Sequence, residues 1–196
     1  PFGYQEYAEY LLNTPPLVYK RQGELIYSEN KLLKNIIPNE LNPDRGELEY
    51  LLTTVFPDVR TKNHLEVRMG DSLPYPYSFG YLAFWKGLLY NKKNLNNLYG
   101  KYKELSLKDF LSRRRRLAEN ELEARWDSRK VSSVYLNLLE DAARGLEPPE
   151  REYLVPLMEL AEQKITPSGK TLETVPKSEK RAFSWCNLNE VIQKEG

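Results

Sequence analysis

Cysteine and histidine are almost missing from this sequence of 196 residues, which contains one of each, Cys186 and His64. A single cysteine cannot form an internal disulfide, so we expect a reducing compartment and a cytoplasmic protein. With so few soft ligands, a zinc site or a Cys–His catalytic pair is not expected. Any chemistry must therefore depend on carboxylates, Arg, Lys and the 14 tyrosines.

An excess of charge of one sign and a long apolar run are also lacking. The chain has 29 Lys and Arg residues against 28 Asp and Glu residues, whereas a dedicated nucleic-acid binder shows a basic surplus. No run approaches the roughly 18 apolar residues of a membrane helix, and no apolar stretch near the start reads as a signal peptide. We therefore expect neither a nucleic-acid nor a membrane partner, and the length suits one domain with a sizeable core.

The most informative stretch runs from Thr53 to Tyr90, and its centre is Leu65-Glu66-Val67-Arg68. Alternating side chains at 59–68 predict one strand, because successive residues of a strand point to opposite faces. Leu65 and Val67 would pack on a core, while Glu66 and Arg68 would project into a concavity. The polar face of this strand would carry Arg60, Lys62, His64, Glu66 and Arg68.

The residue types on this face suit phosphate chemistry. A carboxylate is a ligand that Mg²⁺ prefers, and a guanidinium grips a phosphate in a planar fork. Alternating charge on a strand is also typical of a solvated face with a surface ion pair. The pattern by itself leaves both interpretations open.

Periodicity and turn residues predict the remaining elements. Strands at 17–20 and 24–27 form a hairpin, Phe84 and Trp85 lie in a core, 166–169 is a turn, and Phe183 and Trp185 are candidate anchors in a polar tail. Helices are predicted at 2–12, 29–37 with Ser28 as a cap, 47–54, 79–90, 104–126, 130–144 and 150–164, the last with Pro156 in its first turn.

A run of four arginines, at 113–116, has two interpretations. It could contact nucleic acid, or it could lie on an exposed helix with acidic partners one turn along. Glu119, Glu121 and Glu123 follow the run and favour the second interpretation.

Several segments together resemble the glutamate–cysteine ligase family of the plant and proteobacterial type. The strongest are FPDVRTKNHLEVRMGDSLPY at 56–75 and LAFWKGLLY at 82–90. Weaker ones are FGYQEYAEYLL and LVYK within 2–20, LEDAARGLE at 139–147 and ITPSGKTLE at 165–173. The resemblance covers about residues 2–173 and is weak from 91 to 130.

The resemblance implies an α+β fold: part of a glutamine synthetase-like, curved, mainly antiparallel sheet, followed by a helical C-terminal region. It divides the chain into a sheet-containing part of the catalytic domain at 1–90, a helical region at 91–173 and a polar tail at 174–196. Because the sequence begins with Pro1 in mid-motif, we expect a C-terminal portion whose N-terminal portion is absent. The unpaired edge of a sheet divided in this way favours self-association or pairing with the missing portion.

The family resemblance also implies an activity. ATP, with Mg²⁺, phosphorylates the γ-carboxylate of glutamate, and cysteine attacks the γ-glutamyl phosphate to give γ-glutamylcysteine, the first step of glutathione-type thiol synthesis. By motif match, Glu66 is a metal ligand and Arg68 the catalytic residue that faces the phosphate. Substrate-binding roles fall on Arg60, Lys62 and Tyr75.

Departures from the family pattern leave two points open. Tyr75 stands where the family has Trp, so the acceptor is cysteine or another small amine. The alternative to a ligase is a non-catalytic or divergent module of the same fold that acts only with a partner chain. In either case we expect no activity from this chain alone.

Overall fold

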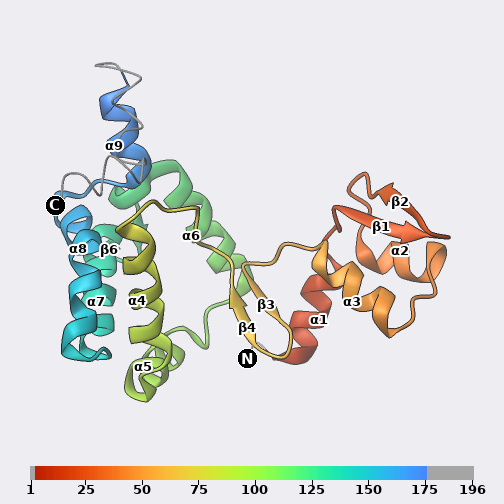
Figure 1. The fold of residues 1–196 in the computed structure, drawn as a ribbon, viewed down its shortest axis with the longest axis horizontal. Helices are drawn as coiled ribbons and strands as arrows, with labels where there is room; N and C mark the ends of the chain where they lie inside the picture. Colours follow the sequence, from red (N-terminus) through yellow and green to blue (C-terminus); the bar gives the residue numbers. More distant parts are fainter. Residues whose placement is uncertain (1–2, 176–196) are drawn as a thin grey trace. The chain divides into compact units, whose positions relative to one another are not determined.

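The computed structural model describes residues 3–175 and divides the chain into two compact units, residues 1–70 and residues 71–196 (Figure 1). From residue 176 on, the predicted polar tail with Phe183, Trp185 and Cys186 lies outside the described residues. The predicted division of the chain at residues 90 and 173 stays a prediction.

Short helices and two hairpins build the first unit. Strands β1 and β2 pair antiparallel with Val18 opposite Tyr27, and the turn between them has positive φ at Gln22 and Gly23. Glycine adopts this conformation at little cost, as hairpin turns require. The predicted first helix and the predicted hairpin are both confirmed. In chain order the elements are α1 (Tyr4–Leu12), β1 (Val18–Arg21), β2 (Glu24–Tyr27), α2 (Leu33–Glu40), α3 (Arg45–Thr53), β3 (Val59–Thr61) and β4 (Leu65–Val67).

A small apolar core joins the helices of this unit to the first hairpin. Burying each large aliphatic side chain contributes about 1.5–3 kcal/mol. The buried hydroxyl of Tyr19 donates to Glu40, whose carboxylate also lies 3.1 Å from Lys31 Nζ. Helix α3 begins with a capping box, in which Asp44 accepts the Glu47 N–H at 2.8 Å. The buried members of this first-unit core are Leu11, Tyr19, Leu33, Ile36, Leu51 and Val55.

Helix α2 differs from the prediction. It begins after Leu32, without Ser28 as its cap, and continues to Glu40 with Pro38 inside it, past the predicted end at residue 37. Leu33 and Ile36 of this helix are fully buried. Packing of these two side chains outweighs the local signals, as tertiary context commonly does.

The largest difference from the prediction lies at 59–68. Two strands, β3 and β4, form an antiparallel hairpin, and the single predicted strand with five polar residues on one face is wrong. Asn63, a turn-forming residue, lies at the tip, where the Lys62 N–H donates to the His64 carbonyl at 2.9 Å. Leu65, which was expected in a core, is 71% exposed.

Helices dominate the second unit. Helices α4 and α7 confirm the predictions for 79–90 and 130–144, and Pro156 lies in the first turn of α8, also as predicted. In chain order the elements are α4 (Tyr77–Leu89), α5 (Lys92–Tyr102), α6 (Leu107–Asn120), η1 (Glu121–Glu123), β5 (Arg125–Trp126), β6 (Arg129–Lys130), α7 (Val131–Arg144), η2 (Pro148–Leu154), α8 (Val155–Gln163) and α9 (Pro167–Thr174).

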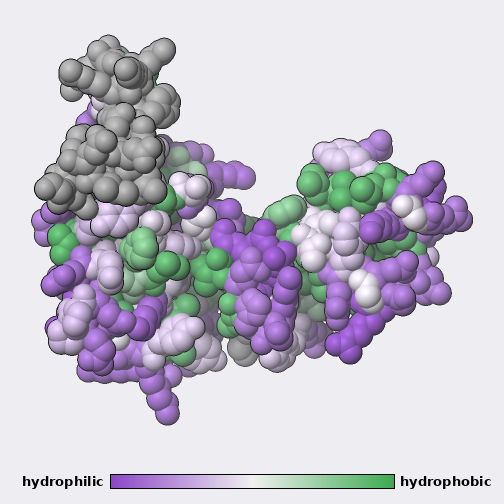
Figure 2. All heavy atoms as spheres, viewed as in Figure 1, coloured by the Kyte–Doolittle hydropathy of each residue, from purple (hydrophilic) through white to green (hydrophobic). Residues whose placement is uncertain are grey.

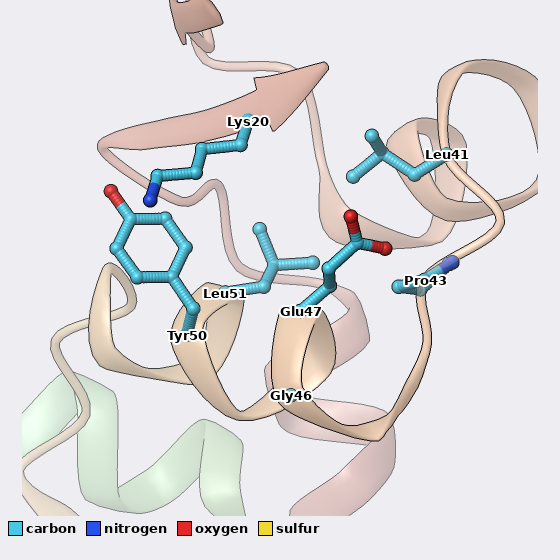
Figure 3. Close-up of a pocket in the computed structure, with 7 residues that line it drawn as sticks. All are labelled: Lys20, Leu41, Pro43, Gly46, Glu47, Tyr50 and Leu51. Carbon is cyan, nitrogen blue, oxygen red and sulfur yellow. The ribbon is translucent and has the colours of Figure 1, made fainter. Parts of the chain in front are cut away.

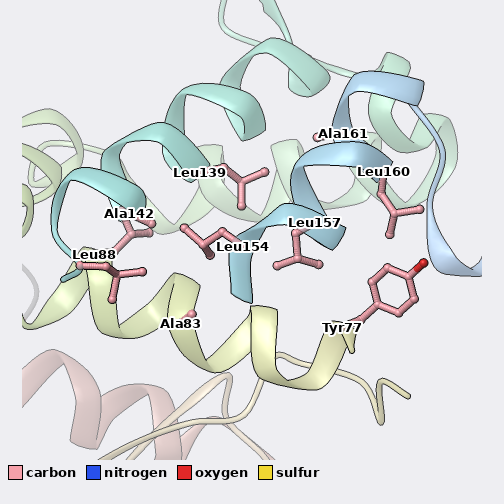
Figure 4. Packing of buried hydrophobic residues seen from close by; sticks show 10 residues of the cluster. Tyr77, Ala83, Leu88, Leu139, Ala142, Leu154, Leu157, Leu160 and Ala161 are labelled. Atoms are coloured by element: carbon pink, nitrogen blue, oxygen red, sulfur yellow. The ribbon is translucent and has the colours of Figure 1, made fainter. Parts of the chain in front are cut away.

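The core of this unit lies between α4, α7 and α8 (Figure 4). Leu139, Leu154 and Ala142 are fully buried there. Phe84 packs against this cluster, as predicted, and lies edge-to-face on Tyr135 at 6.1 Å between ring centroids. Small residues on α4, Gly87 above all, let the backbone of α7 come close to α4.

Two further predictions for the second unit need correction. The helix expected over 104–126 ends at Asn120, and the short β5–β6 hairpin follows it. Arg113 of α6 therefore pairs at 2.7 Å with Asp127 in the turn of this hairpin, not with an acidic residue one turn along α6. The turn expected at 166–169 is the first turn of α9, where the Thr166 hydroxyl caps the Gly169 N–H at 3.0 Å.

Taken over residues 3–175, the fold is α+β and rich in helix. Each strand in this range pairs with one neighbour only, so the expected curved sheet is not formed by these residues. Hydrophilic side chains cover much of the face in Figure 2, and hydrophobic residues are visible near the β1–β2 hairpin. Leu17 and Leu25, in and beside that hairpin, are more than half exposed. None of the described helices is long and apolar enough to cross a membrane.

Candidate functional site

The β3–β4 hairpin brings three predicted site residues together. Arg60 on β3 lies directly opposite Glu66 on β4. Side chains that are directly opposite in an antiparallel pair lie on the same face. Arg68 follows Glu66 by two residues and shares that face, as the period of a strand predicts.

The Glu66 carboxylate bridges the two guanidinium groups. Its Oε2 accepts Nε of Arg60 at 2.9 Å and Nη2 of Arg60 at 2.7 Å, and its Oε1 lies 3.4 Å from Nη1 of Arg68. The side chains of Arg60, Glu66 and Arg68 are 14%, 36% and 22% exposed, so they are partly withdrawn from water. Two cations and one anion leave one positive charge, which suits an anionic ligand such as a phosphoryl group.

The sequence analysis did not identify two neighbours of this arginine–glutamate cluster. Phe56 lies under Arg68, with Cζ 5.2 Å from the ring centroid, which is a cation–π distance. Its position four residues before Arg60, in FPDVR, gives no signal of that contact. The second neighbour is Tyr7 of helix α1, which precedes Thr61 by 54 residues in the sequence. Its hydroxyl accepts the Thr61 N–H at 3.1 Å.

The structure also shows the surroundings of the two other predicted residues, Lys62 and Tyr75. Lys62 is in the turn of the hairpin, where its charge contributes to the electrostatics of Glu66. Tyr75 belongs to the second unit and lies edge-to-face on Phe79 at 5.9 Å, and Phe79 stacks on Tyr153 at 5.8 Å. The substrate-binding roles of Lys62 and Tyr75 stay predictions.

A magnesium site requires several oxygen ligands in octahedral geometry. Residues 3–175 contain no group of three or more His, Cys, Asp or Glu side chains that could hold a metal ion. Both oxygens of Glu66 already face guanidinium groups. The described residues therefore do not fit Mg²⁺ by themselves, and the role of Glu66 as a ligand stays a prediction that needs further oxygens.

The pKa of Glu66 should report the state of this cluster. Hydrogen bonds from Arg60 lower that pKa, and partial burial opposes the effect. A carboxyl group with a lowered pKa stabilises the fold above its unfolded pKa of about 4.3 and loses that contribution as the pH falls through the folded pKa. We expect an NMR titration of Glu66 with a midpoint below the ordinary value, and a higher midpoint in Arg60→Gln. An unchanged midpoint in that variant would contradict the geometry.

Each unit also contains a cavity that none of the three cluster residues lines. The cavity of the first unit, of about 250 Å³, is lined by residues of β1, of α3 and of the segment that precedes α3, with Nζ of Lys20 at 4.4 Å from the Tyr50 ring centroid (Figure 3). The other, of about 600 Å³, is apolar and lies between α6 and α7. Tyr135 lines the second cavity, and burial raises the pKa of Tyr135 to about 12.

Comparisons with known proteins relate the whole described chain to one family. The chain is 26% identical over 181 residues to the chloroplastic glutamate–cysteine ligase of Nicotiana tabacum and 27% identical over 181 residues to that of Medicago truncatula. Each alignment covers 88% of this chain but only 35% and 36% of those proteins. Chloroplastic glutamate–cysteine ligase A of Oryza sativa subsp. indica is 33% identical over 103 residues, which are 50% of this chain and 21% of that protein. The chain thus spans about a third of the length of the first two relatives.

The names of these relatives correct the predicted location. The proteins from tobacco, Medicago, tomato and Arabidopsis are all called chloroplastic, which contradicts the cytoplasmic prediction. That prediction was based on the single cysteine. A low cysteine content excludes an internal disulfide but does not distinguish one compartment from another.

The family model for glutamate-cysteine ligase family 2 (GCS2) matches residues 1–174. This range includes every motif on which the resemblance was based, from the first helix to ITPSGKTLE. It also includes the hairpin that joins Arg60, Glu66 and Arg68. The chain therefore belongs to glutamate-cysteine ligase family 2.

Proposed function

We propose that this chain is a C-terminal portion of an ATP-dependent ligase that forms γ-glutamylcysteine from glutamate and cysteine. The observation that carries the proposal is the bridge from Glu66 to two partly buried guanidinium groups within the range of the family match. Two anions, ATP and the γ-carboxylate of glutamate, must approach each other in this reaction. Fixed cations offset their repulsion.

The chemistry assigns a role to each residue of the cluster. When the γ-phosphoryl group passes from ATP to the γ-carboxylate, negative charge spreads over its oxygens, and Arg68 neutralises that charge. Arg60 binds the phosphate or the carboxylate substrate beside it. Glu66 keeps the two guanidinium groups a few ångströms apart and in fixed orientation. The amine of cysteine then attacks the acyl phosphate and inorganic phosphate leaves.

Other parts of the proposal concern the complete protein. Lys62 and Tyr75 contribute to substrate binding, and the smaller ring of Tyr75 admits cysteine or another small amine. Because the described residues do not form a magnesium site, further ligands for Mg²⁺, and most of the ATP site, are expected from the two thirds of the relatives that this chain does not match. In that assembly, residues 1–90 join a curved glutamine synthetase-like sheet, and residues 91–173 form its helical region.

A turnover assay tests this proposal. The purified 196-residue chain, with Mg²⁺, ATP, glutamate and cysteine, should release no ADP above background, because the metal ligands are incomplete. Addition of the remaining polypeptide should give ADP release that depends on both amino acids. Turnover by the chain alone would overturn the division of the site, and inactivity of the complete protein would favour a non-catalytic module.

A further inference from the structure

Tyr7 connects helix α1 to the candidate site. Its ring packs against the first-unit core, and its hydroxyl accepts the Thr61 N–H at 3.1 Å. Thr61 is the last residue of β3 and follows Arg60 directly. A side chain anchored in the core thus holds the backbone next to a guanidinium of the cluster.

The hairpin needs such an anchor. Isolated two-stranded hairpins are marginally stable in water, and β3 and β4 are three residues each. Leu65, opposite Thr61, is 71% exposed and contributes little burial to this end of the hairpin. Backbone hydrogen bonds and contacts to the rest of the first unit must therefore limit its motion.

We propose that Tyr7 is a positioning residue that acts through Thr61 to hold Arg60 in register with Glu66. The inference rests on the proposed function, because the value of the position depends on Arg60 and Arg68 binding an anionic substrate. Freeing the Thr61 N–H lets β3 shift against α1, and Arg60 moves with it. A displaced Arg60 weakens the binding of an anionic substrate, because a guanidinium must match the geometry of the phosphate or carboxylate that it holds.

Tyr7→Phe tests the inference in the complete protein that carries this chain. The variant keeps the ring in the core and removes the acceptor oxygen. Tyr10→Phe is the matched control, because Tyr10 lies on the same helix and packs against the same first-unit core. The first measurement is hydrogen exchange by mass spectrometry on peptides spanning 56–68, which needs no turnover.

We expect exchange at Thr61 to accelerate at least about tenfold in Tyr7→Phe, since the N–H loses its partner, and to stay unchanged in Tyr10→Phe. The KM for glutamate or ATP should rise about tenfold in Tyr7→Phe, and kcat should change less, because a binding group is displaced while the reacting groups remain. The melting temperatures of the two variants should be similar.

The two proposals fail in different ways. Equal exchange at Thr61 in Tyr7→Phe and wild type overturns the role of Tyr7, whether or not the protein is a ligase. Faster exchange with unchanged KM and kcat also overturns the positioning role, because the hairpin then moves without consequence. An inactive complete protein overturns the proposed function, and the exchange experiment still decides whether Tyr7 holds the hairpin.

Discussion

Glu66→Gln in the complete enzyme should lower kcat by about 100-fold or more, because Arg68, which stabilises charge in the transition state, loses the carboxylate that orients it. The amide has nearly the same shape but no charge. Without the carboxylate, the guanidinium groups of Arg60 and Arg68 repel each other and leave their shared orientation. The measurement is phosphate release at saturating ATP, glutamate and cysteine, together with a melting curve.

A matched control separates this effect from loss of any ion pair. Lys86 and Glu150 form an exposed pair in the second unit. Because such pairs contribute about 0–1 kcal/mol, Glu150→Gln should leave both kcat and the melting temperature nearly unchanged. Wild-type kcat in a folded Glu66→Gln protein would show that Glu66 serves neither the phosphate nor its arginines.

Gly87→Ala should strongly destabilise the second unit. A Cβ at Gly87 would lie 2.2 Å from the Ala142 carbonyl oxygen and 2.7 Å from its carbon, both backbone atoms of α7. Rotamer changes cannot relieve this contact, so α4 and α7 must separate. Overpacking commonly costs about 1–3 kcal/mol, and we expect the upper end or more. The unit should melt at least about 10 °C lower.

Gly100→Ala, on the neighbouring helix α5, should change the melting temperature in the opposite direction. Nothing lies within 4 Å of a Cβ at Gly100, which is in α5. Alanine is favoured over glycine in a helix interior by roughly 0.5–1 kcal/mol, so this variant should melt slightly higher. Calorimetry should compare the melting temperatures of Gly87→Ala, Gly100→Ala and wild type. A Gly87→Ala protein as stable as wild type would contradict the close approach of α4 and α7.

Local signals predicted much of this protein. Apolar spacing located α1, α4 and α7, and the turn at Gln22 and Gly23 located the first hairpin. The motif from FPDVR to LAFWKGLLY was sufficient to indicate the family, because it combines unusual residues at fixed spacing. The period of two correctly placed Glu66 and Arg68 on one face.

Local signals could not predict which strands pair or which residues distant in the sequence are in contact. Alternation at 59–68 has the same appearance in one long strand and in two short ones, and only the turn at Asn63 sets Arg60 opposite Glu66. The distant contacts of Tyr7 with Thr61 and of Phe56 with Arg68 have no periodic signature.

The sequence by itself thus determined the family, most of the helices and the residue types of the candidate site, because these depend on neighbours along the chain. The tertiary structure decided the register of the site hairpin and the reason for Gly87 in the GLLY motif. Both depend on backbone atoms brought together from distant segments, and those approaches are set by packing.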